Sequence, residues 1–181
     1  DPGCRGWVGR VGAAAWAAGA AVTVYPLGVR HQTSVQIAAR WRAEAAPRLR
    51  EGADCRIVLS FGTNDATIED GAQRVAPELS VATLERVLDE LRGLGLPAFV
   101  VGPPPSGDAA QDERLVGLSQ RFGARCRERA VPFAGVIEAL LQTPSWVREA
   151  AAGDGSHPAA GGYDALAKLV LHAGWCDWVG S

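Results

Sequence analysis

The chain has 181 residues, which is enough to bury a proper core within one α/β domain. Apolar residues make up 48% and charged residues 21%, and this composition excludes a disordered or fibrous chain. The formal net charge of −2 gives no electrostatic reason to expect a nucleic-acid partner.

The first third of the chain predicts two helices and two strands. Apolar residues at helical spacing predict a helix over residues 6–18, and the β-rich run at 21–27 predicts a strand. Ser34 can cap a helix that runs to about residue 50, and the apolar run at 56–61 predicts a strand covered on both faces. Residues 11–29 carry no charge, but Gly19 and Pro26 interrupt them, so we expect no membrane span.

The rest of the chain continues this alternation. Leu84 to Leu91 predict a helix that ends near Gly93, and a buried strand follows at 98–101. We expect a further helix around 115–126, a short strand at 132–133 and a last helix around 163–170. Helices that alternate with short buried strands predict a single α/β domain over residues 1–181, with a parallel sheet between helices on both faces.

Cysteines and arginines carry no separate function in this sequence. The sequence has four cysteines that form no cluster, so we expect no metal site; they are Cys4, Cys55, Cys126 and Cys176. A chain this long with a real core does not need disulfides, so we expect reduced thiols. We also expect a cytoplasmic protein. The arginine-rich runs at 40–50 and 121–129 contain interspersed glutamates, which indicates solvated helix faces rather than a nucleic-acid surface.

Three polar segments stand at strand ends or in the last loop, where open parallel sheets bind ligands. They are residues 28–34, residues 62–65 and residues 153–158. In the last segment, Asp154 precedes His157 by three residues, so its carboxylate can reach Nδ1 and leave Nε2 to act as a general base. The alternative is a loop histidine beside a capping aspartate.

Asn64 is the only asparagine in the chain, and it follows the best predicted strand. Its side-chain amide could donate a hydrogen bond to an oxyanion that forms during a reaction. The alternative is an ordinary turn residue, because Asn-Asp pairs favour turns.

Together, Gly-Thr-Asn-Asp at 62–65 and Asp-Gly-Ser-His-Pro at 154–158 resemble two signature blocks of the SGNH, or GDSL-type, serine hydrolases. The resemblance covers essentially the whole chain. It implies a flavodoxin-like α/β/α sandwich and ester hydrolysis through an acyl-enzyme, without a metal or organic cofactor. It also implies that His157 is the general base, Asp154 its orienting partner and Asn64 an oxyanion-hole donor.

The sequence departs from the family pattern at two places. His31 stands where the family has a glycine whose backbone N–H serves the oxyanion hole; its own N–H can keep that role. The His31 ring either fills a pocket wall or adds a catalytic group. The second departure is the nucleophile, because the chain has no Gly-Asp-Ser block.

None of the serines in the sequence replaces this block convincingly. Ser34 lies at a predicted helix start and Ser60 within a predicted strand. Ser106 lies in a proline-rich loop and Ser156 inside the Asp-His turn. We therefore expect an upstream segment that carries the first, central strand and the nucleophilic serine. Without it, two buried strands would lack their ladder partners.

The resulting hypothesis is a serine esterase that acts on small esters, with no nucleic-acid partner. A nucleophile-free relative that binds esters or glycans is the alternative. A flavodoxin-like binder of phosphates or nucleotides is a weaker one, because the chain lacks a glycine-rich phosphate loop.

Overall fold

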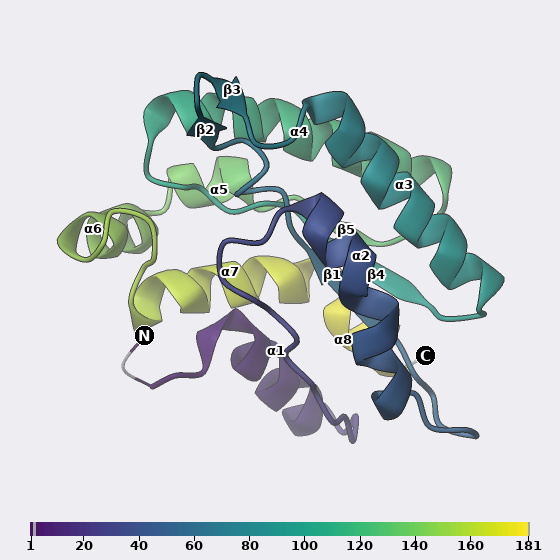
Figure 1. Ribbon diagram of the computed structural model, residues 1–181. Helices are drawn as coiled ribbons and strands as arrows, with labels where there is room; N and C mark the ends of the chain where they lie inside the picture. The colour runs from purple at the N-terminus through teal and green to yellow at the C-terminus, as the bar shows by residue number, and fades with distance from the viewer. Residues whose placement is uncertain (2, 181) are drawn as a thin grey trace.

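The structure is a computed structural model that describes Asp1 and residues 3–180. Figure 1 shows how helices surround a small central sheet. The helices are α1 Gly6–Ala17, α2 Ser34–Ala45, α3 Pro77–Gly93, α4 Ala109–Glu128, α5 Ile137–Leu141, α6 Pro144–Ala152, α7 Ala160–His172 and α8 Trp175–Gly180, with one 3₁₀ turn at Ala46–Arg48. The strands are β1 Ile57–Ser60, β2 Ile68–Glu69, β3 Ala72–Gln73, β4 Ala98–Val101 and β5 Phe133–Ala134.

The central sheet is parallel and follows the order β1-β4-β5, with Val58 opposite Phe99 and Val101 opposite Ala134. β2 and β3 form a separate antiparallel hairpin in the connection between β1 and α3. The parallel sheet flanked by helices confirms the predicted fold class. It also brings the segments after β1 and β4 to the same edge of the sheet.

Two apolar cores cover the two faces of the sheet. On one face, α2, α3 and α4 pack around Trp41, Leu84 and Phe122. On the other face, α1, α7 and α8 pack around Val11 and Trp175, and this core also contains Phe99 of β4. Within the described residues, no helix is both long and apolar enough to cross a membrane.

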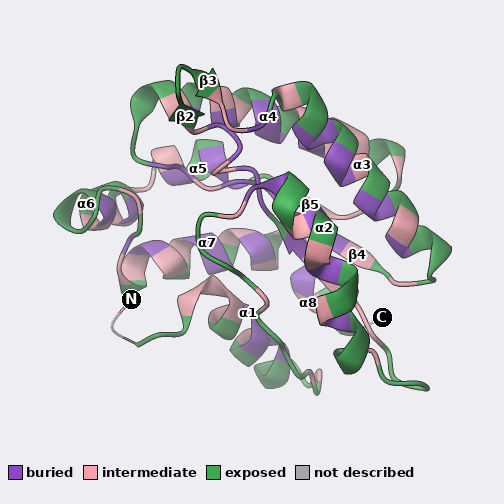
Figure 2. Cartoon of the chain, in the orientation of Figure 1, coloured by how far each residue is buried: buried purple, intermediate pink, exposed green. Residues whose placement is uncertain are grey.

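The predicted strand at 21–27 is wrong. Residues 18–29 form no helix or strand, and Figure 2 shows that most of them are exposed. The physical reason is the absence of a ladder partner: within the described chain, the sheet ends at β1, which pairs only with β4. Extended residues become a strand only when their backbone groups pair with a neighbour. Instead, Val22 accepts a hydrogen bond from the indole of Trp16 (2.7 Å), and Leu27 accepts one from Arg40 (2.8 Å).

The expected cap of α2 is also wrong by one residue. Thr33, not Ser34, is the N-cap: its hydroxyl accepts a hydrogen bond from the Gln36 N–H, and the Gln36 side chain accepts one from the Thr33 N–H. Ser34 is the first helical residue and is fully buried.

The short helices α5, α6 and α8 have no counterpart among the predicted elements, because each spans too few turns to show a clear apolar period.

Candidate active site

The loop between α6 and α7 carries the two residues predicted to form an acid–base pair. Asp154 and His157 lie three residues apart, and Oδ2 of Asp154 is 2.8 Å from Nδ1 of His157. Both side chains are more than half exposed, at 55% and 63%. A carboxylate on Nδ1 favours the tautomer that carries its proton there, which leaves Nε2 able to accept a proton. Nε2 has no hydrogen-bond partner within the described residues.

Asp154 is held in its ionised form by the turn itself. Its Oδ1 accepts hydrogen bonds from the backbone N–H of His157 (2.8 Å) and of Ser156 (2.9 Å). These two bonds, followed by the bond from the His157 ring, hold the pKa of the Asp154 carboxyl well below its ordinary value of 3.8. The turn therefore fixes both the position and the charge of the carboxylate.

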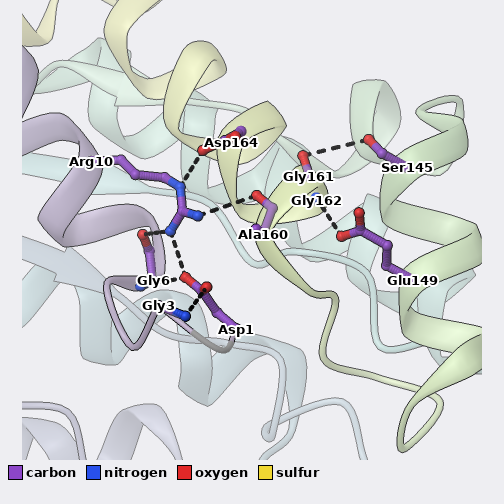
Figure 3. Close-up of polar contacts among 10 residues, drawn as sticks. All are labelled: Asp1, Gly3, Gly6, Arg10, Ser145, Glu149, Ala160, Gly161, Gly162 and Asp164. Carbon is purple, nitrogen blue, oxygen red and sulfur yellow. Dashed lines mark hydrogen bonds and ion pairs between the residues drawn. The ribbon is translucent and has the colours of Figure 1, made fainter.

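The charged side chains of Glu149 and Arg10 hold the flanks of this loop, as Figure 3 shows. Glu149 of α6 accepts a hydrogen bond from the Gly162 N–H in the first turn of α7 (2.8 Å), and so connects the helix before the loop to the helix after it. Arg10 of α1 forms ion pairs with Asp164 and with Asp1, and donates to the carbonyl of Ala160. The loop is thus anchored at the start of α7, where the N-cap has no side-chain hydrogen bond.

Asn64 lies in the turn that follows β1 and faces the segment before α2. Its Nδ2 donates a hydrogen bond to the carbonyl of Gln32 (3.0 Å), which uses one of the two N–H bonds of the amide. The second N–H remains for another acceptor. The contact places Asn64 beside His31, the other residue predicted to contribute to an oxyanion hole.

His31 adopts a left-handed backbone conformation (φ 62°). This conformation is the one that favours glycine, and histidine is among the few other residues that adopt it with some frequency. The Arg74 guanidinium donates to the His31 carbonyl (2.9 Å), so the peptide after His31 is held in one orientation. The His31 side chain is exposed. Its ring makes no hydrogen bond within the described residues, so the two predicted roles of the ring, pocket wall and added catalytic group, stay predictions.

Asp65 fixes the two oxyanion candidates relative to each other, and the sequence analysis missed it. Its side chain is almost fully buried; Oδ1 accepts a hydrogen bond from the Ser34 N–H and Oδ2 one from the Ser80 hydroxyl, both at 2.7 Å. The carboxylate therefore ties the turn after β1 to the first turn of α2. The sequence shows an acidic residue directly after Asn64, but its burial and its two partners depend on the fold.

Two hollows adjoin the Asp-His loop. The first, about 300 Å³, is lined by Arg30, Asp154 and His157, so it joins the segment before α2 to the acid–base pair. The second, about 370 Å³, lies between the start of α4 and α6 and reaches Gly155. Its walls are mostly apolar and include none of the predicted site residues. The smaller hollow is therefore the place where chemistry could occur.

The described residues do not bring a serine hydroxyl to His157. Ser34 is buried, Ser106 donates to Asp112 (2.8 Å), and no hydrogen bond joins any described serine to the His157 ring. The same part of the chain holds no group of three acidic, histidine or cysteine side chains close enough to bind a metal ion.

Comparison with known families decides the class. The family model for GDSL-like lipases and acylhydrolases matches residues 1–165. The chain belongs to the GDSL-like lipase/acylhydrolase family. The family match covers the segment before α2, the turn after β1 and the Asp-His loop, as the sequence resemblance predicts. A comparison with curated protein sequences gives no match.

Solved structures of several esterases and acylhydrolases have the same fold. A lipase/acylhydrolase from Enterococcus faecalis is 22% identical, with a TM-score of 0.74 over 92% of this chain and 83% of that one. The acetylxylan esterase Axe2 from Geobacillus stearothermophilus is 19% identical, with a TM-score of 0.77 over 93% and 80%. LAE5, an α/β hydrolase from the metagenome of Lake Arreo, Spain, is 20% identical, with a TM-score of 0.75 over 94% and 82%.

Proposed function

We propose that this GDSL-like family member is a serine esterase that cleaves carboxylic esters through an acyl-enzyme. The observation that carries the proposal is the 2.8 Å contact between Asp154 and His157 in a hollow that opens to solvent. A carboxylate–histidine contact buried in a core would serve packing, whereas this one leaves Nε2 accessible to a substrate. Family membership supports the same reaction.

In this mechanism His157 moves the protons. As a serine oxygen attacks the ester carbonyl carbon, Nε2 of His157 accepts the hydroxyl proton and then gives it to the departing alcohol. Water repeats the two steps on the acyl-enzyme, which releases the acid and restores the serine. Asp154 holds the His157 ring in place and stabilises the imidazolium that forms in each half-reaction.

Asn64 and His31 stabilise the negative charge on the carbonyl oxygen. The second N–H of the Asn64 amide and the backbone N–H of His31 are the two donors, on adjacent segments joined by the Asn64–Gln32 bond. Asp65 and Arg74 act as positioning residues, because they hold these two segments in fixed orientations. Preorganised donors of this kind cost no rearrangement when the charge develops.

The nucleophilic serine belongs, in this proposal, to a strand outside the residues of the given sequence. The open edge of β1 supports this placement, because a parallel strand there would end beside the turn at Asn64.

Hydrolysis of a neutral aryl acetate by the protein expressed from its complete coding sequence tests the proposal. His157→Ala should reduce kcat by about 10⁴-fold or more, and Asn64→Ala by about 10²-fold. His172→Ala is the matched control, because His172 lies in the last turn of α7, away from the hollow. If the wild-type protein binds esters without turnover, or if His157→Ala matches the control, the esterase proposal fails and a ligand-binding role replaces it.

A further inference from the structure

Arg30 is the third residue that lines the hollow of Asp154 and His157, and no step of the proposed hydrolysis uses it. It lies in the turn before α2 and is exposed. Its neighbour in the chain is His31, whose N–H is a proposed oxyanion donor. Arg30 therefore shares a hollow with the proposed general base and adjoins a proposed oxyanion donor in the chain.

The other arginines around this turn are engaged with the protein. Arg40 donates to the Leu27 carbonyl and pairs with Glu44, and Arg74 donates to the His31 carbonyl and pairs with Glu69. These contacts hold the backbone of the turn. Arg30 has no hydrogen bond or ion pair within the described part of the chain, so its five N–H donors remain for a ligand.

The one carboxylate in the hollow does not compete strongly for Arg30. Asp154 already accepts three hydrogen bonds, two from backbone N–H groups and one from the His157 ring. A guanidinium with unused donors prefers a carboxylate or phosphate, which it binds through two parallel hydrogen bonds. A neutral acyl chain would leave the arginine solvated and would gain nothing from it.

We propose that Arg30 is a specificity residue that selects esters carrying an anionic group, a carboxylate or phosphate, close to the scissile bond. This inference rests on the proposed esterase function and narrows its substrate class. The contact would add binding energy in the ground state and in the transition state alike, because the anionic group takes no part in bond breaking. It therefore acts on kcat/KM for anionic esters and leaves neutral esters nearly unaffected.

Three acetate or succinate esters separate the possibilities. 4-Nitrophenyl acetate is neutral, the 4-nitrophenyl monoester of succinate carries a carboxylate on the acyl side, and 4-acetoxybenzoate carries one on the alcohol side. In each variant, kcat/KM for an anionic ester is divided by kcat/KM for the neutral one, so intrinsic differences in ester reactivity cancel between proteins. The ester that shows the larger effect identifies the side of the scissile bond that Arg30 contacts.

Arg30→Gln should lower this ratio by about 10-fold or more for at least one anionic ester, and change the neutral ester less than 3-fold. Arg30→Lys should give an intermediate ratio, since it keeps the charge but loses the planar fork. Arg127→Gln, an exposed arginine in the last turn of α4, should leave the ratio unchanged. An unchanged ratio in Arg30→Gln, or an equal loss for all three esters, would overturn the inference.

Direct binding distinguishes failure of this inference from failure of the esterase proposal. Benzoate and benzamide differ in charge and are similar in shape, and NMR titration can follow the Arg30 side-chain signal with each of them. The inference requires tighter binding of benzoate, with the preference lost in Arg30→Gln. If the wild-type protein hydrolyses none of the three esters but still shows this preference, the reaction is wrong and the anion site stands. Equal binding of both probes rejects the anion site.

Discussion

Substitution of Gly107 should displace the Asp154–His157 loop, and its effect on kcat can be compared with its effect on the free energy of unfolding. It has φ 87° and lies against Gly155, between Asp154 and His157 in the sequence. A β-carbon on residue 107 would lie 2.9 Å from the carbonyl carbon of Gly155. It would lie even closer to the carbonyl oxygen of Gly155 and would overlap it. Because the clash is between two backbones, a rotamer change cannot relieve it, and the Asp-His loop must move.

The cost has two parts that a second variant separates. Alanine in a left-handed conformation costs about 1 kcal/mol, and overpacking costs about 1–3 kcal/mol more. Gly174 has φ 92° with no atom within 4 Å of an added Cβ, so Gly174→Ala carries the first cost alone. We expect Gly107→Ala to lower the free energy of unfolding by 1–3 kcal/mol more than Gly174→Ala does. A shift of the loop by about 1 Å should also reduce kcat by about 10²-fold.

Urea unfolding and hydrolysis of 4-nitrophenyl acetate measure the two effects in the same protein preparations. The reasoning requires Gly107→Ala to lose kcat well beyond what Gly174→Ala loses, under conditions in which both variants are folded. If the two variants lose the same stability and keep the same kcat, Gly107 does not determine the position of the Asp-His loop.

Three further predictions concern charge and burial. Glu149→Gln should lower the free energy of unfolding by about 1 kcal/mol, because it weakens the hydrogen bond to the Gly162 N–H at the start of α7. Urea unfolding measures the loss, and Glu51→Gln, at an exposed position, is the control. The pKa of Asp154 in the folded protein lies below 3.8, so the ionised carboxylate should stabilise the fold as the pH falls to 4 and lose this effect only at more acidic pH. A ¹³C NMR titration in which the Asp154 carboxyl titrates near 3.8 would refute this prediction. Burial raises the pKa of the Cys126 thiol to about 12, so alkylation at pH 8 followed by mass spectrometry should modify the exposed Cys4 and leave Cys126 intact.

The sequence predicted the elements that form strong, long patterns. β1 and β4 are continuous apolar runs between breakers, and α1 and α4 repeat apolar residues over three or more turns. The segment at 21–27 has the composition of a strand, but a strand also requires a neighbour, and local composition cannot supply one. α3 begins at Pro77, earlier than its leucines suggest, because proline fits the first turn of a helix.

The structure joins Asp154 to His157, and Asn64 to the segment that contains His31, through contacts of different kinds. The Asp154–His157 contact follows from a three-residue spacing within one turn, so the sequence could define it. The bond between Asn64 and Gln32 joins residues 32 positions apart and depends on the order of the sheet. The sequence does not single out Asp65 or Arg30. Asp65 is buried and Arg30 lines the hollow of Asp154 and His157, and both positions depend on segments that are distant in the chain.

The central claim is that His157 activates a serine for attack on an acyl carbon. The most direct test is intact-mass spectrometry of the protein expressed from its complete coding sequence, after exposure to a fluorophosphonate that reacts with activated serines. We predict one phosphonyl adduct on one serine in the wild-type protein, and labelling slowed by at least about 10³-fold in His157→Ala. A wild-type protein that acquires no adduct, or a His157→Ala variant labelled at the same rate, would contradict the account.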